Sequence, residues 1–342
     1  MAHSPRLITL ANRVIRMGRL YASNRSLKAV GRIPGFAARR LFLRPVPANV
    51  SIALTYRCQL RCAHCYSNAS DRNDQEELTT GEVKSIIDQV RRLGALQVIF
   101  SAGEPLLRKD LDEIISHAHQ AGLLTRLNTN GLLLDRARAF GLKKAGLTQC
   151  AVSIDHPDAS IHDSLRGVPG AFARAVQGIR HLRDAGIPCQ ICTYASRRLI
   201  PDGLEKIISL GRRLGVMSVY FFWPVAAGRL NLSFDLMLSP KERAIVRTLQ
   251  DPTFVHMELP TAQTRCDVII KRILFISPRG DVTPCPFVPY LLGNVRSRPL
   301  AEIWRRHVSM LTLDYRDDCI MNDVRQRELI EEHAASVAGS LG

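Results

Sequence analysis

The chain has 342 residues, of which 46% are hydrophobic, and this is enough apolar material for one large domain and a smaller one. No apolar run reaches the roughly 20 residues that a membrane span needs, and the N-terminus lacks the pattern of a secretory signal, so we expect a soluble cytoplasmic protein. Nine cysteines, an odd number, then indicate metal ligation in a reducing compartment rather than a disulfide framework.

The net charge of +16 is concentrated in the N-terminal segment. Residues 1–70 contain no Asp or Glu, and ten Lys or Arg residues precede Pro47. Apolar residues interleave with Arg13, Arg16 and Arg19, which predicts a basic amphipathic helical extension over residues 1–48. Three interpretations stay open: peripheral contact with an anionic membrane, docking of an acidic substrate, and a solvated helix that covers one end of the main domain.

From residue 49 the chain alternates short apolar runs with helical patterns. Thr79 and Glu82 form a capping-box pattern ahead of a helix that ends at Gly94, and another helix is predicted from Asp110. Two more helices are predicted over 171–182 and 201–214. The predicted strands are 49–56, 96–101, 123–128, 148–154, 187–193 and 216–223.

Six strand–helix units in succession predict parallel strands joined by right-handed crossovers. We therefore expect an α/β fold, a partial (β/α)6 TIM-like barrel over residues 49–238, with helices on one face of the sheet and a filled face opposite. The functional residues of such a barrel lie at the C-terminal ends of its strands.

After Ser239 the regular alternation of strands and helices ends, and residues 239–342 are predicted to form a small C-terminal α+β module. It begins with a helical pattern in SPKERAIVRTL (239–249) and contains a strand over 272–278 followed by a turn around Gly280. The module holds Cys266, Cys285 and Cys319.

Three cysteines, Cys58, Cys62 and Cys65, are crowded into the loop after the first predicted strand. Their neighbours are polar, which argues against a buried helix face. A structural zinc ion takes four ligands, and His64 is the one local candidate for a fourth. A four-iron, four-sulfur cluster on three thiolates instead leaves one iron open to the amine and carboxylate of S-adenosylmethionine (SAM).

The C-x3-C-x2-C spacing resembles the signature of the radical SAM superfamily, and the resemblance extends over roughly residues 49–230. The motifs that carry it are SAGEP (101–105), NTNG (128–131), SID (153–155), HDSLRGVPGAF (162–172) and PVAAGR (224–229). The resemblance implies a [4Fe–4S] cluster on Cys58, Cys62 and Cys65. It also implies SAM contacts from His64, Ala102, Gly103, Glu104, Asn128, Ser153, Asp155 and Arg166. Ala102 replaces the usual first Gly of its motif, and His64 stands where the family usually has an aromatic residue.

The second set of cysteines resembles the opening of the SPASM module, and GNVRSRPLAEIW (293–304) resembles its continuation. Cys266, Cys285 and Cys319 imply one auxiliary [4Fe–4S] cluster, as in the shortened "twitch" form. Its fourth iron is capped by a nearby residue such as Asp317, Asp318, Asn322 or Asp323, or is open to substrate. A module that has lost its cluster is the alternative. Cys150, Cys189 and Cys192 are predicted to be structural.

The resemblance implies an enzyme in which a donor such as flavodoxin or ferredoxin supplies one electron. SAM is then cleaved to a 5′-deoxyadenosyl radical that abstracts a substrate hydrogen; the sequence assigns no further catalytic residue. The predicted substrate is a small-molecule or lipid-linked biosynthetic intermediate, with maturation of a ribosomal peptide as the alternative. A zinc-containing nucleic-acid-binding protein is a remote alternative, since no recognised nucleic-acid module is present.

Overall fold

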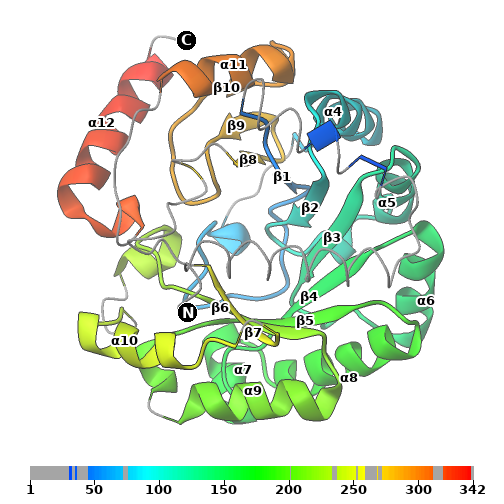
Figure 1. The fold of residues 1–342 in the computed structure, drawn as a ribbon, viewed down its shortest axis with the longest axis vertical. Coiled ribbons are helices and arrows are strands. Elements are labelled where there is room, and N and C mark those ends of the chain that lie inside the picture. Colours follow the sequence, from blue (N-terminus) through cyan, green and yellow to red (C-terminus); the bar gives the residue numbers. More distant parts are fainter. Residues whose placement is uncertain are drawn as a thin grey trace, which may run out of the picture.

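The protein is described by a computed structural model over residues 31–32, 35–36, 45–71, 76–200, 202–232, 237–251, 253–258, 268, 272–310 and 319–339. Most of the predicted basic extension, and Cys266, lie outside these residues. The described strands form one curved sheet in the order β10-β9-β8-β1-β2-β3-β4-β5-β6-β7. Helices α4 to α9 surround its outer face (Figure 1). Among the described residues, no helix combines the length and apolarity needed to cross a membrane.

The central strands are parallel and follow the chain in order, which confirms the α/β barrel-like fold. They are β1 (Asn49–Ala53), β2 (Gln97–Ser101), β3 (Leu124–Thr129), β4 (Gln149–Ser153), β5 (Cys189–Tyr194) and β6 (Ser218–Phe222). The helices between them are α4 (Thr80–Leu93), α5 (Leu111–Gln120), α6 (Arg136–Ala145), α7 (Ala159–Arg166), α8 (Ala171–Asp184) and α9 (Gly203–Leu214). The predicted capping box at Thr79 is present, and Gly94 ends α4 in the left-handed conformation.

The sheet is wider than the predicted six parallel strands. β7 (Val255–Glu258) adds in parallel to β6, and β8 (Ile273–Ile276) adds in parallel to β1. The short strands β9 (Asp281–Thr283) and β10 (Gly293–Asn294) continue from β8 in antiparallel fashion. The C-terminal segment thus shares the sheet of the barrel, because the backbone edge of β1 needs hydrogen-bond partners.

The remaining helices lie on the C-terminal part of the chain. They are α10 (Pro240–Thr248), α11 (Leu300–Met310) and α12 (Val324–Gly339). Ser239 and Glu242 form a second capping box at the start of α10, as expected for the helix predicted there.

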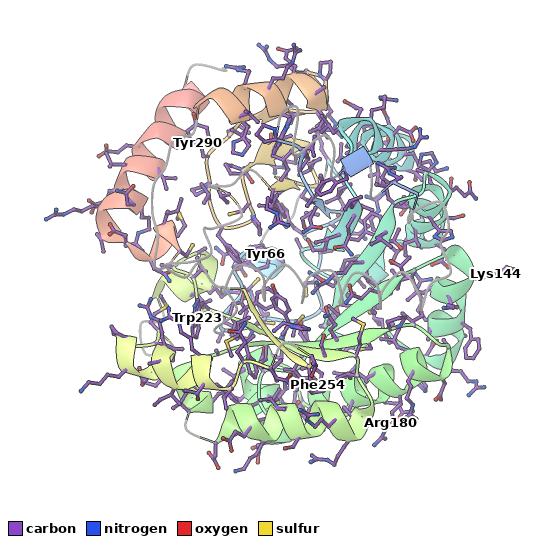
Figure 2. The ribbon with its side chains drawn as sticks, viewed as in Figure 1. Tyr66, Lys144, Arg180, Trp223, Phe254 and Tyr290 are labelled. Atoms are coloured by element: carbon purple, nitrogen blue, oxygen red, sulfur yellow. The ribbon has the colours of Figure 1, made fainter. Side chains whose placement is uncertain are left out.

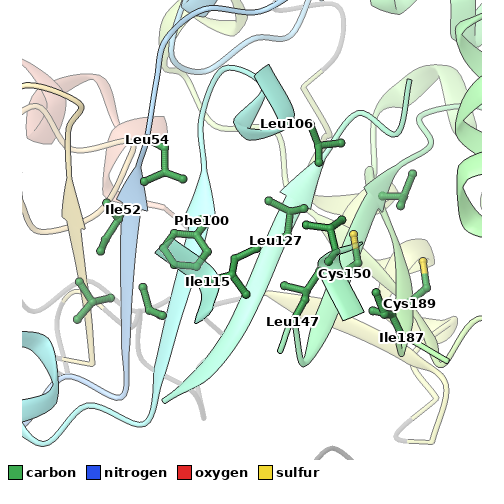
Figure 3. Packing of buried hydrophobic residues seen from close by; sticks show 14 of the residues in the cluster. Ile52, Leu54, Phe100, Leu106, Ile115, Leu127, Leu147, Cys150, Ile187 and Cys189 are labelled. Atoms are coloured by element: carbon green, nitrogen blue, oxygen red, sulfur yellow. The ribbon is translucent and has the colours of Figure 1, made fainter. Parts of the chain in front are cut away.

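The main core lies between the outer face of the sheet and the helices. Ile52, Phe100 and Leu127 from three adjacent strands pack with Ile115 of α5 (Figure 3). Fully burying a side chain of this kind stabilises the fold by about 1.5–3 kcal/mol. Cys150 and Cys189 belong to this same core, where burial raises the pKa of both thiols.

The inner face of the sheet is different from the predicted filled face. Arg126, Asn128, Tyr194, Tyr220 and Phe222 point away from the main core and keep part of their surface accessible, whereas the residues alternating with them are buried. Tyr66, from the loop after β1, lies inside the ring of strands (Figure 2). The inner face of β3 to β6 is therefore partly exposed, on the side of the sheet where Tyr66 lies.

Candidate functional site

The loop after β1 carries the three clustered cysteines and is held from two sides. The amides of Arg61 and Ala63 donate to the carbonyls of Arg166 and Leu165 at the end of α7, at 3.2 and 2.9 Å. On the other side, Arg229 donates from its backbone amide to the carbonyl of Cys65 (3.0 Å) and from Nη1 to that of Cys62 (2.9 Å). The predicted motifs at 162–172 and 224–229 thus position the cysteine loop.

The three thiols lie close enough to influence one another. Burial raises the pKa of Cys58 to about 12, and the charges of Glu104, Cys62 and Cys65 add to this rise. Burial also raises the pKa of Cys62, although the Arg166 guanidinium, 3.6 Å from its Sγ, opposes that rise. Cys58 and Cys65 both pack on a small apolar cluster that includes Tyr56. The free thiols of Cys58 and Cys62 are therefore protonated, and iron binding must release their protons.

The donor set fits a cluster better than a single ion. Among the described residues, no three His, Cys, Asp or Glu side chains converge closely enough to hold one metal ion. A four-iron cluster does not require the thiolates to converge on one point, because each thiolate binds a different iron at a separate corner. His64, the local candidate for a fourth zinc ligand, instead places Nε2 3.1 Å from Oδ2 of Asp155.

The SAGEP turn at the end of β2 packs against the exit of β1. Ala102 and Gly103 both have left-handed backbones, with φ of 60° and 52°. A Cβ on Gly103 would lie 2.6 Å from the carbonyl oxygens of Thr55 and Arg57, so this position requires glycine. Ala102 adopts the conformation at a cost of about 1–2 kcal/mol, which explains the expected glycine at its position.

Glu104 is fully buried and joins the ends of β2 and β3. Its carboxylate accepts hydrogen bonds from the amides of Leu106 (3.1 Å) and Asn130 (2.9 Å) and from Oγ1 of Thr129 (2.8 Å). Burial raises the pKa of Glu104 to about 7, and these hydrogen bonds limit the rise. A carboxylate offers about four acceptor positions, so roughly one remains for a ligand ammonium.

Asp155 connects the cysteine loop with α7. Its Oδ2 lies 2.5 Å from Nε of Arg166 and 3.1 Å from Nε2 of His64, and its amide donates to Nδ1 of His162 at 3.1 Å. Burial opposes ionisation of Asp155, but the charge of Arg166 and the hydrogen bond with His64 outweigh it and hold the pKa of Asp155 far below the usual range. Asp158, rather than Asp155, caps α7.

A small cavity adjoins this charged cluster. The ring of His64 meets the ring of Tyr194 edge-on, with centroids 5.1 Å apart. The residues lining the cavity are His64, Asp155, Leu165, Tyr194, Ser196, Pro224 and Leu230. Tyr194 and Ser196 were missed from the sequence, although their place at the end of β5 was a usable signal.

The other two predicted SAM contacts lie on the inner face of the sheet. Asn128 of β3 accepts a hydrogen bond at Oδ1 from Nε of Arg126 (3.0 Å). Ser153, at the end of β4, is in register with Cys192 of β5. These residues thus face the same side of the sheet, and Asn128 already has a partner within β3.

The described part of the second cysteine set lies in one apolar cluster. Cys285 and Cys319, far apart in the chain, both belong to the apolar cluster that also contains Val225, from the segment after β6. The side chain of Asn322 accepts from the amide of Ala226 (2.8 Å) and donates to the carbonyl of Pro224 (3.1 Å). Asn322 is therefore engaged by the barrel, which disfavours it as the cap of an auxiliary cluster.

Comparison with known families finds two matches in this chain. The model described as "Radical SAM superfamily" matches residues 52–210, and the SPASM model, described as "Iron-sulfur cluster-binding domain", matches residues 266–327. The first match contains the cysteine loop and the ends of β1 to β5. The second contains Cys266, Cys285 and Cys319.

Individual proteins agree with these matches. An "AdoMet-dependent heme synthase" of Nitratidesulfovibrio vulgaris is 32% identical over 293 residues, covering 77% of this chain and 80% of the relative. A "PqqA peptide cyclase" of Rhodopseudomonas palustris is 32% identical, covering 76% and 74%. Among solved structures, SuiB of Streptococcus suis bound to S-adenosylmethionine superposes with a TM-score of 0.64 at 16% identity, covering 78% of this chain and 68% of that one. The structural likeness shows a shared fold.

Proposed function

The chain belongs to the radical SAM superfamily and carries a SPASM domain, and from this premise we propose that it transforms a small-molecule biosynthetic intermediate. Membership implies a [4Fe–4S] cluster with SAM, and the SPASM domain implies auxiliary iron–sulfur binding. When bound, this pair supplies a 5′-deoxyadenosyl radical that removes a hydrogen atom from the substrate. The observation that supports SAM-dependent chemistry is that three thiols, Glu104 and the Asp155–Arg166 pair lie at neighbouring strand ends.

The chain's own residues are assigned roles by their contacts. Cys58, Cys62 and Cys65 hold the cluster, and Arg166 beside Cys62 offsets the negative charge that thiolates bring into a buried place. Glu104 has one free acceptor position for the methionyl ammonium. His64 and Tyr194 line the small cavity beside Asp155, and we assign their rings to contact the adenine.

The remaining predicted residues are also given proposed roles. Gly103 and Ala102 let the backbone come close to the ligand, and Asn128 and Ser153 offer polar groups on the inner face.

Cys266, Cys285 and Cys319 are proposed as ligands of one auxiliary cluster. This cluster would accept an electron from the substrate radical and make the net reaction an oxidation. A flavodoxin or ferredoxin is proposed as donor, and the location as cytoplasmic, with the basic extension at a membrane surface.

The small-molecule proposal is supported by the relatives named as heme synthases. A peptide substrate is the second candidate. It is favoured by the relative named as a PqqA peptide cyclase, which has the same 32% sequence identity to this chain as the first heme synthase. Incubation with substrate pools deuterated at carbon separates the two. Deuterium in 5′-deoxyadenosine from a fractionated metabolite extract supports the first proposal, and deuterium from peptides alone contradicts it.

The cofactor roles are tested by anaerobic reconstitution with iron and sulfide. We expect about eight irons per chain if both clusters form, and release of 5′-deoxyadenosine from SAM on reduction with dithionite. Cys62→Ser should lose about four irons and abolish SAM cleavage. Cys189→Ala, in the main core, is the matched control and should retain both. A colourless zinc protein without SAM cleavage would refute the proposal.

A further inference from the structure

Arg126 is a cation placed on the inner face of the barrel. It projects from β3 and is partly exposed. Its Nε donates to Oδ1 of Asn128 (3.0 Å), and its Nη2 lies 3.5 Å from Sγ of Cys192. Asn128 stands two residues further along β3, and Cys192 is in register with Ser153 at the end of β4. The guanidinium therefore extends toward the end of the barrel that carries the cysteine loop.

No carboxylate of the described residues lies within ion-pair distance of Arg126. The two arginines that are buried among the described residues do have carboxylate partners: Arg108 contacts Asp110, and Arg166 contacts Asp155. Placing a cation in a sheltered position without an anion is costly, and folded proteins usually pair it. The described contacts occupy two of the five N–H donors of Arg126, so most of its planar fork is available to a ligand.

An aromatic row connects Arg126 with the cysteine loop. The guanidinium lies over Tyr220, 5.9 Å from the ring centroid. From there the ring centroids are separated by 4.9 Å between Tyr220 and Phe222, 6.1 Å between Phe222 and Tyr194, and 5.1 Å between Tyr194 and His64. The inner faces of β5 and β6 thus present an apolar wall with a cation at one end and the cysteine loop at the other.

We propose that Arg126 binds a carboxylate of the substrate, whose apolar body lies along this aromatic row. The inference rests on the proposed function, since it takes the inner face as the substrate site. A single guanidinium matches one carboxylate through two parallel hydrogen bonds. A phosphate dianion carries more charge than the lone cation at this position balances. The substrate is therefore an apolar molecule with a carboxylate, held so that its far end approaches the cysteine loop.

The test measures discrimination between matched ligands by the reconstituted protein with SAM bound. The probes are 1-pyrenebutyrate, the uncharged 1-pyrenebutanol and 1-pyrenebutyl phosphate, followed by equilibrium dialysis. We expect wild type to bind the carboxylate about tenfold more tightly than the alcohol, since a hydrogen bond to a charged group is worth about that much. Arg126→Met should bring this ratio close to one, and Arg126→Lys should give an intermediate ratio because it keeps the charge without the fork.

The control is Arg212→Met. Arg212 belongs to α9 on the outer face of the sheet, and its guanidinium lies 4.5 Å from the ring of Phe254. This variant should keep the wild-type ratio. Iron content and the thermal unfolding midpoint report whether Arg126→Met retains its fold. If it does not, the affinity ratio of Arg126→Lys tests the proposal in its place. Three outcomes would each overturn the proposal. They are no saturable binding of 1-pyrenebutyrate to wild type, an unchanged carboxylate-to-alcohol affinity ratio in Arg126→Met, and tighter binding of 1-pyrenebutyl phosphate than of the carboxylate. Failure of the proposed function is seen separately, as absence of 5′-deoxyadenosine from wild type.

Discussion

His162 shows at the residue scale how burial sets the charge of a side chain near the site. It is 1% exposed, and its Nδ1 accepts a hydrogen bond from the amide of Asp155. Burial lowers the pKa of His162 to about 4, and the charge of Asp155 only partly opposes this. The ring is therefore neutral at physiological pH, and its neutral form fixes the backbone that carries Asp155.

Because the folded pKa of His162 is below its unfolded value of 6.5, the folded state binds fewer protons than the unfolded state between pH 6.5 and 4. The contribution of His162 to stability is thus present above pH 6.5 and is lost as pH falls toward 4. His162→Asn keeps an acceptor near the Nδ1 position but does not titrate. Between pH 7 and 5.5 we expect wild type to lose about 1 kcal/mol more unfolding free energy than this variant.

Urea titrations of both proteins at several pH values measure the difference. Parallel loss of stability in the two proteins would show that His162 does not carry this pH dependence.

At the element scale, the segment after β6 acts as a support for the cysteine loop. Gly228 has φ of 57°, and a Cβ there would collide with the carbonyl oxygens of Cys65 and Tyr66. Gly228→Ala should therefore displace the loop and sharply reduce iron incorporation at the first cluster. Gly186→Ala is the matched control, since Gly186 also has a positive φ (67°) but open space around its Cβ position. It should cost about 1–2 kcal/mol of unfolding free energy and retain full iron content.

Iron analysis after reconstitution decides this prediction. Equal iron content in the two variants would mean that the contact between Gly228 and the loop is dispensable.

The same segment is connected to the C-terminal part by Asn322. Asn322→Ala removes the hydrogen bonds to Ala226 and Pro224 and leaves a buried amide and carbonyl without these partners, at a cost of about 1–3 kcal/mol. Asn322→Asp keeps the acceptor and loses the donor, so we expect an intermediate loss. Urea unfolding of the three proteins measures the series. Wild-type stability in both variants would contradict the role of Asn322 as a connection between the two cysteine regions.

On the scale of the whole molecule, the C-terminal part is built into the barrel. Leu274 and Ile276 of β8 belong to the main core, and β8 supplies the backbone partners of β1. The domain division predicted at residue 238 stays a proposal, and the shared sheet predicts that the barrel does not fold alone. A chain ending at residue 258 should lose cooperative urea unfolding and become sensitive to proteolysis.

A chain ending at residue 323 is the control for this truncation. It removes α12, whose Val324 and Leu329 are exposed and whose Ile330 packs in the apolar cluster that contains Cys285 and Cys319. Cooperative unfolding should survive in this shorter chain. If the chain ending at residue 258 also unfolded cooperatively, the barrel would be an independent domain.

The sequence by itself determined the parallel α/β core and its functional edge. Capping residues, helical spacing and apolar runs are local signals, so the strands β1 to β6, the helices α4, α5, α8 and α9, and the loop of Cys58, Cys62 and Cys65 could be predicted from the sequence. The strand predicted over 272–278 contains β8, but its pairing with β1 could not be predicted, and β7 was not predicted at all. Both strands have four residues and depend on the edges of β1 and β6 for their hydrogen bonds.

Tertiary structure decided which side chains meet. Asp155 contacts His64 and Arg166, and Asn322 contacts the segment after β6. Arg126 lies over Tyr220 at one end of an aromatic row, and each of these contacts joins residues from different elements. No local pattern specifies such meetings, because they follow from the register and curvature of the sheet. The sequence shows the three clustered thiols, whereas the site proposed for a substrate carboxylate is defined only when β3, β4, β5 and β6 form one sheet.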